Sequence, residues 1–278
     1  MCRLYGFRAS EPTKVECTLV RAQNALVSQS RSDAAGRSHG DGWGIGYYRD
    51  GEGRVERRVA AAFEDLHFSV TAERVHSRTV VAHVRKATKG RNALENTHPF
   101  QHGRWMFAHN GTLTAFERLH PRLERDCDSD LLLARRGQTD SELIFYWLLS
   151  RMRREGMAPA EPHVELPRLV DLVRGATREL DALNAAAGAE QPAQLNFILT
   201  DGAALVASRW RHPLNWVARQ GIHDCEICGI PHIQHDESVD YRAVVVASEP
   251  ISHEPWRELP DGGVLSVDGA LRHAVHAG

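Results

Sequence analysis

Apolar residues follow two different spacings along the chain, and the two spacings occur in separate blocks. Short runs of strand length, bounded by turn residues, occupy the chain up to about residue 110 and return after the middle of the sequence. A final hairpin is predicted over Gly263–Leu271, with its turn at Asp268-Gly269. The clearest strands are predicted at Thr79–Val84, Trp105–His109, Leu195–Thr200, Ala204–Ser208 and Arg242–Ala247.

Between these blocks the apolar spacing becomes helical. Thr139-Asp140-Ser141-Glu142 has the pattern of a capping box, and an apolar stripe from Leu143 to Met152 follows it. A second stripe runs from Leu169 to Leu183 and ends near Gly188, with the proline-containing segment Met157–Pro167 as a surface connection. Strands, two helices and then strands indicate an α+β fold with antiparallel sheets, in a single domain covering residues 1–278.

A glycine-rich run, His39–Gly46, offers an alternative interpretation as a phosphate-binding loop. It lacks the Gly-Lys-Ser/Thr ending of such loops, and no crossover helix is predicted after it. The sequence therefore disfavours nucleotide binding.

Composition narrows the class of protein further. The net charge of −2 gives no basic surplus for a nucleic acid or a membrane surface. The longest apolar runs, such as Val244–Ala247, are too short to span a bilayer, and the N-terminus lacks the apolar core of a secretory signal. The five cysteines are an odd number, and only Cys225 and Cys228 lie close together, which favours a reducing compartment and predicts a cytoplasmic protein.

The second residue is the first candidate for chemistry. Removal of Met1 exposes Cys2 with an α-amine that titrates near ~7.7–8.0, so nucleophile and general base can reside on one residue. An ordinary cysteine near a start codon is the alternative.

Three further groups could complete such a site. Arg85 follows a predicted strand and could bind a carboxylate through parallel hydrogen bonds, or form an ordinary ion pair. Asn110 and Gly111 offer two neutral donors for an oxyanion, or form a hairpin turn. Asp140 could bind a substrate ammonium, or support the start of its helix.

Taken together, six motifs resemble the class II glutamine amidotransferases, in the order found in that family and across half of the chain. The motifs are Met-Cys-Arg-Leu-Tyr-Gly at the N-terminus, Asp41-Gly42-Trp43-Gly44, His83-Val84-Arg85-Lys86-Ala87-Thr88, Asn96-Thr97-His98-Pro99-Phe100, His109-Asn110-Gly111-Thr112 and Thr139-Asp140-Ser141-Glu142.

The resemblance implies a four-layer αββα sandwich of the N-terminal nucleophile hydrolases and no required cofactor. It implies that Cys2 is the nucleophile and that Asn110 and Gly111 form the oxyanion hole. The substrate-binding residues that it implies are Arg85 and Thr88 for the glutamine α-carboxylate, Asp140 for the α-amine and His98 as a residue that shapes the pocket. Asp41 and Trp43 would be supporting residues near the nucleophile.

The chain ends soon after Glu249-Pro250 and Trp256, and this ending resembles the stand-alone amidotransferases of glutathione degradation and ergothioneine synthesis. The expected substrate is glutamine or a small γ-glutamyl compound, with either release of ammonia or its delivery to a partner subunit, and a homo-oligomer is compatible with this expectation. The competing hypothesis is a non-catalytic regulatory or metal-binding scaffold of the same fold.

One segment is left unexplained by these motifs. Cys225-Glu226-Ile227-Cys228, with His232 and His235, supplies a possible S₂N₂ ligand set for structural zinc. The two histidines are closer together than in a usual zinc finger, and a reduced loop without metal is the alternative.

Overall fold

The computed structural model describes residues 2–157, 165–221, 225, 228–229 and 240–278. The strands are β1 (Arg3–Lys14), β2 (Trp43–Arg49), β3 (Glu52–Arg58), β4 (His76–Val84), β5 (Phe100–His102), β6 (Trp105–Thr112), β7 (Gln194–Thr200), β8 (Leu205–Ser208), β9 (Asn215–Gln220), β10 (Arg242–Ala247), β11 (Arg257–Glu258), β12 (Val264–Val267) and β13 (His273–His276). The helices are α1 (Leu26–Arg31), α2 (Leu66–Arg74), α3 (Phe116–Arg125), α4 (Ser129–Leu132), α5 (Asp140–Arg154) and α6 (Leu166–Ala186), with a π-helical turn η1 (Cys17–Arg21) and a 3₁₀ turn η2 (Leu94–Asn96).

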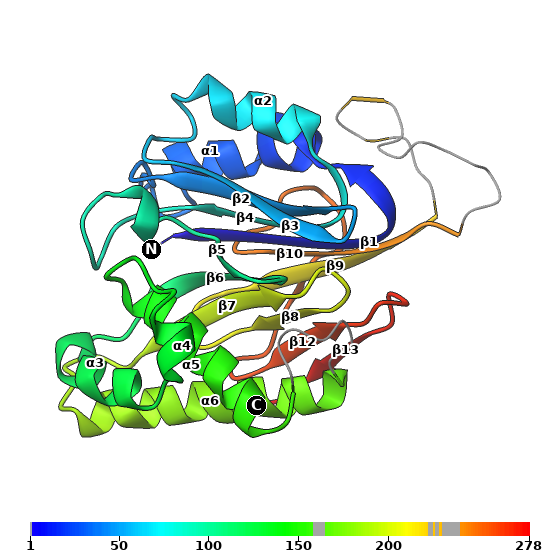
Figure 1. Ribbon diagram of the computed structural model, residues 1–278. Helices are drawn as coiled ribbons and strands as arrows, with labels where there is room; N and C mark the ends of the chain where they lie inside the picture. The colour runs from blue at the N-terminus through cyan, green and yellow to red at the C-terminus, as the bar shows by residue number, and fades with distance from the viewer. Residues whose placement is uncertain (1, 158–164, 222–224, 226–227, 230–239) are drawn as a thin grey trace.

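The strands form two antiparallel sheets that lie face to face. Sheet A has the order β11-β9-β10-β1-β4-β2-β3, and sheet B has the order β13-β12-β8-β7-β6-β5. Figure 1 shows α1 and α2 covering the outer face of sheet A, and α3, α5 and α6 covering the outer face of sheet B. The predicted α+β fold with a four-layer αββα sandwich is confirmed.

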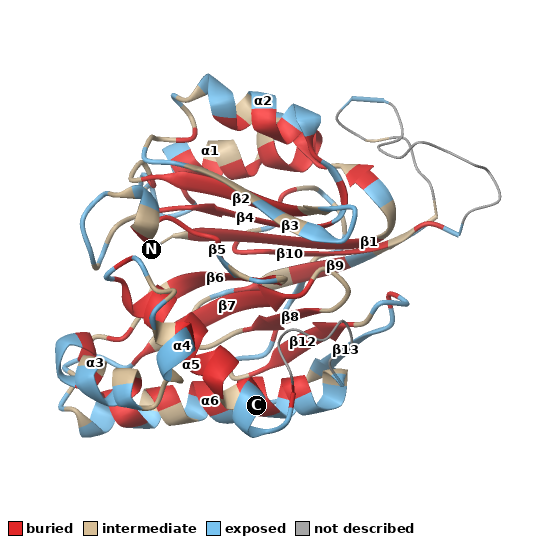
Figure 2. Ribbon diagram, in the orientation of Figure 1, coloured by how far each residue is buried: buried red, intermediate tan, exposed pale blue. Residues whose placement is uncertain are grey.

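The alternation of side chains along β1 explains why two core layers meet at one strand. Tyr5 and Phe7 are buried in the core between sheet A and its helices, whereas Leu4 is buried in the core between the two sheets. Successive side chains of a strand point to opposite faces, so one strand serves both layers. A third core lies between sheet B and its helices. In Figure 2 the inner strands of both sheets are accordingly mostly in the buried class, whereas the edge strands β3, β11 and β13 are mostly intermediate or exposed.

The two predicted helices appear close to where the sequence pattern put them. Thr139 is the N-cap of α5, and its side chain accepts a hydrogen bond from the Glu142 N–H at 3.2 Å. Glu142 does not complete the capping box, because its carboxylate accepts from the N–H groups of Arg136 and Gly137 instead. The helix α6 is followed by Gly188 in a left-handed conformation, with φ of +71°.

Glycines in the run His39–Gly46 allow the two sheets to approach closely. A Cβ on Gly44 would lie 2.1 Å from the carbonyl oxygen of His98, so no other residue fits there. The run continues directly into strand β2, which a phosphate-binding loop does not do. The nucleotide-binding alternative is therefore wrong. Among the described residues, no helix is both long and apolar enough to cross a membrane.

Candidate active site

Cys2 directly precedes β1, at one end of the sandwich (Figure 1). By the alternation of β1, it projects from the same face as Leu4, which belongs to the inter-sheet core. Its sulfur contacts the second residue of the loop after β4: the Lys86 N–H donates to Sγ at 3.3 Å, and Sγ donates to the Lys86 carbonyl at 3.4 Å. The loop after β4 thus fixes the sulfur through backbone groups.

The environment of Cys2 favours the neutral thiol. Burial raises the pKa of the Cys2 thiol, and the Lys86 N–H and the charge of Arg85 oppose this only in part. A thiol in this setting needs a base to become a nucleophile at neutral pH.

Arg85 is buried, and its own loop wraps around it. Its Nη1 donates to Asn92 Oδ1 at 2.9 Å, and its Nη2 donates to the carbonyls of Lys89 at 2.9 Å and Gly90 at 3.3 Å. A guanidinium carries more N–H groups than these three contacts use, so donors remain for a further acceptor. Burial lowers the pKa of Arg85, although it stays a cation at neutral pH.

Asp41 holds the same loop from the other side. Its carboxylate accepts hydrogen bonds from the Ala87 N–H at 2.8 Å and from Asn92 Nδ2 at 2.9 Å, while Asn92 also accepts from Arg85. Asp41 therefore positions the loop that contacts Cys2 and encloses Arg85, which is a supporting role.

Asn110 and Gly111 lie within β6, so they are not a hairpin turn. Asn110 is buried, on the inter-sheet side like Ala108, and its Oδ1 has no hydrogen-bond partner among the described residues. A Cβ on Gly111 would lie 1.8 Å from the carbonyl oxygen of Gln194 on β7, so only glycine fits. The unsatisfied buried Oδ1 of Asn110, beside an obligatory glycine, is an acceptor that a donor on a ligand can complete.

Asp140 begins α5 and is buried. Its carboxylate accepts from the Leu113 N–H at 2.8 Å and from the Ser141 N–H at 2.9 Å, so it joins the start of α5 to the end of β6. A carboxylate has lone pairs beyond those that two N–H groups use, so it can also accept from an ammonium. His109 reinforces this junction, because its Nδ1 lies 2.9 Å from Ser141 Oγ and its Nε2 lies 3.1 Å from the Gln194 carbonyl.

His98 is buried against a second histidine. Its ring centroid lies 4.2 Å from that of His83 on β4 and 4.5 Å from that of Phe100. Neither ring nitrogen of His98 or of His83 has a hydrogen-bond partner in the part of the chain that the structure describes. Burial lowers the pKa of His83 to about 3 and holds that of His98 well below its usual range. Both rings are therefore neutral near pH 7.

The two remaining predicted residues are Thr88 and Trp43. Thr88 is exposed in the loop after β4. Trp43 belongs to the core between sheet A and its helices, where its ring meets Phe68 edge-on at 5.3 Å and its Nε1 donates to Asp65 at 2.9 Å. Trp43 thus anchors β2 to α2, on the helix-covered side of the sheet.

Sequence reasoning missed a buried ionic network beneath Cys2. Arg3 Nη1 donates to the Cys2 carbonyl at 3.0 Å, and Nη2 pairs with Asp33 and, at 2.9 Å, with Glu249. Burial opposes ionisation of Asp33, yet the Arg37 N–H and the Arg3 charge hold the pKa of that carboxyl well below its usual range. Residue 33 sits in a turn ahead of Gly36, but no local pattern joins it to residue 3.

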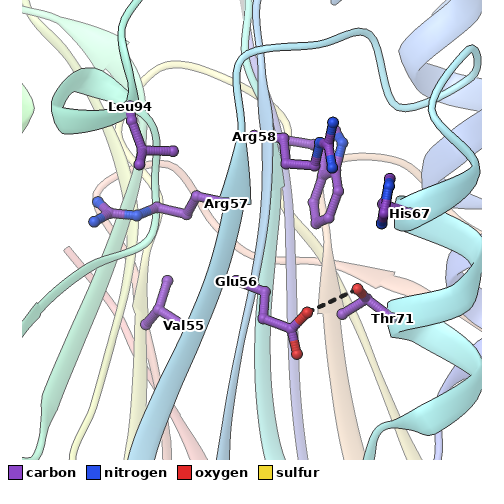
Figure 3. Close-up of a pocket in the computed structure, with 8 residues that line it drawn as sticks. Val55, Glu56, Arg57, Arg58, His67, Thr71 and Leu94 are labelled. Carbon is purple, nitrogen blue, oxygen red and sulfur yellow. Dashed lines mark hydrogen bonds between the residues drawn. The ribbon is translucent and has the colours of Figure 1, made fainter.

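A separate pocket lies between β3 and α2 and has a volume of about 340 Å³. Figure 3 shows Glu56 and Thr71 facing each other across it, joined by a hydrogen bond of 3.0 Å. The residues that line it do not include Cys2, Arg85 or Asn110. The lining residues are Trp43, Val55, Glu56, Arg57, Arg58, His67, Thr71 and Leu94.

The predicted zinc ligands are only partly described. The sulfurs of Cys225 and Cys228 lie close to that of Cys17, which the sequence did not implicate. His232 and His235 lie outside the described residues.

Comparison with known proteins identifies the family. Residues 1–277 match the family model described as glutamine amidotransferases class-II. This chain belongs to the class II glutamine amidotransferases. It is thus an enzyme of that family, in agreement with the resemblance of its six motifs, and the non-catalytic scaffold is disfavoured.

Two curated relatives and one solved structure are similar over nearly the whole length of this amidotransferase. The probable glutamine amidotransferase DUG3 of Saccharomyces cerevisiae is 27% identical, with 96% of this chain and 82% of that protein covered. The gamma-glutamyl-hercynylcysteine sulfoxide hydrolase of Mycobacterium tuberculosis is 25% identical, with coverage of 96% and 93%. A class-II domain protein from Silicibacter pomeroyi has the same fold, with a TM-score of 0.64, 21% identity and 99% of each chain covered.

Proposed function

We propose that this chain hydrolyses the γ-amide of glutamine or of a small γ-glutamyl compound, with Cys2 as an N-terminal nucleophile. The observation that carries the proposal is the setting of Cys2: a sulfur on the second residue, between the sheets, held by the backbone of Lys86. Because burial raises the pKa of this thiol, a base must act on it, and the α-amine that removal of Met1 exposes is the nearest one.

The reaction then follows from the groups around the sulfur. The sulfur of Cys2 attacks the side-chain carbonyl of the substrate, while its proton passes to the α-amine. The oxyanion that forms is stabilised by the Asn110 amide and the Gly111 N–H. The amine returns the proton to the leaving ammonia or amine, and water hydrolyses the γ-glutamyl thioester to release glutamate. Every group in these steps belongs to the chain, so the proposal assigns no cofactor to the reaction.

Arg85 and Asp140 are the proposed anchors for the two charged groups of the glutamyl moiety. The guanidinium of Arg85 would exchange its contacts with the carbonyls of Lys89 and Gly90 for the α-carboxylate, since a charged acceptor binds more strongly than a neutral one. Asp140 would accept from the α-ammonium. In this proposal Thr88 lies beside the carboxylate and His98 lines the pocket as a neutral ring.

The relatives favour a small γ-glutamyl substrate over a large one. The name of the mycobacterial relative specifies a γ-glutamyl hydrolase, and its similarity covers 96% of this chain. We therefore propose that residues 1–278 act as one glutamine amidotransferase domain that releases glutamate from such a compound. In a variant of this proposal, the ammonia released from the γ-amide of glutamine is delivered to a partner subunit.

Glutamate release tests the proposal. Mature protein, with loss of Met1 verified by intact mass, is assayed against glutamine, glutathione and other γ-glutamyl peptides. We expect release from at least one compound, none in Cys2→Ala, and covalent labelling of residue 2 by a glutamine-like alkylating agent. Cys127→Ala, which changes a half-buried cysteine on the far side of sheet B, is the matched control and should retain activity.

A blocked N-terminus separates the roles of sulfur and amine. Insertion of a lysine between Met1 and Cys2 keeps the thiol but buries its nitrogen in a peptide bond, so turnover should be lost although the thiol persists. A blocked variant as active as the mature enzyme would refute the amine as base. A correctly trimmed, folded protein that releases no glutamate from any of these compounds and resists labelling would refute the proposed reaction.

A further inference from the structure

Three cysteine sulfurs meet at a second place in the molecule. The Sγ atoms of Cys17, Cys225 and Cys228 all lie within 4.8 Å of one another. Cys17 is buried at the start of η1, Cys225 is partly buried and Cys228 is exposed. Thiol groups that come this close from two distant parts of the chain are arranged as a ligand set for a thiophilic ion or as a source of disulfides.

Backbone hydrogen bonds form turns at both chain segments that supply the three sulfurs. The Gly229 N–H donates to the Cys225 carbonyl at 2.8 Å, which closes a turn that contains both cysteines of the Cys-x-x-Cys pair, and Gly229 has a φ of +70°. On the opposite side, the Ala22 N–H donates to the Cys17 carbonyl at 2.8 Å and holds η1 in its wide turn. The turn presents two sulfurs from one loop to the third.

The distances fit a tetrahedral ion better than a disulfide. A zinc–sulfur bond of about 2.3 Å in a tetrahedron puts neighbouring sulfurs about 3.8 Å apart, so sulfurs that lie within 4.8 Å of one another need to approach by no more than about 1 Å. A disulfide would bring two sulfurs to about 2.05 Å and leave the third cysteine without a function in the cluster. A shared ion accounts for all three sulfurs.

We propose that Cys17, Cys225 and Cys228 are three ligands of a structural zinc ion. Binding exchanges the three thiol protons for Zn²⁺ and leaves one position of the tetrahedron for a fourth ligand beyond these residues.

The position of the site indicates what the ion would do. Residues 221–241 connect β9 to β10, and connections longer than about 12–15 residues are uncommon in compact domains. The ion would fasten this connection to η1, which follows β1 on the helix-covered side of sheet A. A metal ion that links residues so far apart in the sequence lowers the conformational entropy of the unfolded chain. We therefore expect the ion to raise the stability of the folded state.

The zinc site and the proposed active site are far apart. Cys2 precedes β1 and Cys17 follows it, and the 12 residues of this strand extend over roughly 40 Å. Figure 1 shows the N-terminus at one end of the sandwich and the end of β1 at the other. Loss of zinc should therefore leave the chemistry at Cys2 intact, and the two proposals can fail separately.

Metal content of the full chain tests the proposal. Tag-free protein purified with a thiol reductant should contain about one zinc ion per chain, by elemental mass spectrometry. Cys228→Ser, which changes an exposed residue and should fold, is expected to fall below about a tenth of that content, as are Cys225→Ser and Cys17→Ser. Cys127→Ser is the matched control and should keep its zinc. Replacement by Co²⁺ should give the visible bands of a tetrahedral thiolate site, which Cys17→Ser weakens.

Three outcomes would overturn the proposal. The first is reduced wild-type protein that contains no zinc and takes up none from an added equivalent. The second is a Cys17→Ser variant, folded by circular dichroism, with unchanged zinc content and an unchanged Co²⁺ spectrum. The third is a mass two units low, showing a disulfide that persists in the reductant. In the supporting case a chelator lowers the melting temperature of wild type but not of Cys228→Ser.

Discussion

The sulfurs of Cys2 and Cys17 lie at opposite ends of one strand and have opposite kinds of surroundings. The sulfur of Cys2 is held by the backbone N–H and carbonyl of one residue, Lys86, and part of the cysteine is exposed. The sulfur of Cys17 is buried and faces two other sulfurs. Burial raises the pKa of both thiols. A single sulfur beside an α-amine that can accept its proton is suited to attack a carbonyl. A cluster of sulfurs is suited to bind a shared cation.

The largest expected effect is that a substitution at either sulfur site abolishes the property of that site and leaves the property of the other site unchanged. Cys2→Ala should lose all glutamate release and keep its zinc, because its sulfur is the nucleophile and lies far from the cluster. Cys228→Ser should lose its zinc and keep its activity. Parallel measurement of turnover and metal content checks this, and a variant that loses both properties while folded would show that the two sites are coupled.

Asn110→Ala tests the proposed oxyanion hole at the Cys2 site. Removal of one oxyanion donor typically lowers kcat by about 10²–10³-fold, with little change in KM, since the donor acts mainly in the transition state. Steady-state kinetics at several substrate concentrations measure the two parameters separately. Asn24→Ala removes a surface amide that bonds only to the Pro250 carbonyl and should leave kcat and zinc content unchanged. An unchanged kcat in Asn110→Ala would remove Asn110 from the oxyanion hole.

Arg85→Lys should act on binding instead of on the chemical step. Loss of hydrogen bonds to a charged group costs about 1.5–3 kcal/mol, so KM should rise roughly 10- to 100-fold. Arg91→Lys is the matched control, because Arg91 lies in the same loop but is exposed and pairs with Glu95 at 2.8 Å. If both variants raise KM equally, the effect belongs to the loop and not to carboxylate binding.

The last expected effect is a change in how stability depends on pH. His83 is neutral when folded, with its pKa lowered to about 3 by burial, whereas an unfolded histidine titrates near ~6.5. As the pH falls from about 6.5 towards 3, the unfolded chain binds a proton that the folded chain does not, and the free energy of unfolding decreases by up to about 1.4 kcal/mol per pH unit.

His83→Gln should reduce the pH dependence of the free energy of unfolding by the contribution of one histidine. The contributions of His98, His109 and His39 should remain. Urea unfolding at a series of pH values measures the slope. His253 is exposed, so the control variant His253→Gln should leave the slope unchanged. A slope that is identical in His83→Gln and wild type would mean that His83 is already solvated and protonated in the folded protein.

Part of this structure could be predicted because the signals are local. Short apolar runs of strand length placed β4, β6 and β10, and the Thr139 cap and apolar stripe placed α5. The helices α1, α2 and α3 were missed because the first two are short and the third contains Pro121, a residue that helices usually avoid. Their helical state is stabilised by packing against the sheets, as the burial of Phe68 in α2 illustrates.

The sequence by itself determined the layers, the family and the residues at the ends of β1, β4 and β6, since strand alternation and ordered motifs are written in consecutive residues. Only the tertiary structure decided which distant groups meet. It brought Asp33 to Arg3, closed the loop after β4 over Arg85 and added Cys17 to Cys225 and Cys228. The physical reason is that such contacts depend on how the chain folds back on itself, and no spacing of neighbouring residues encodes the partner.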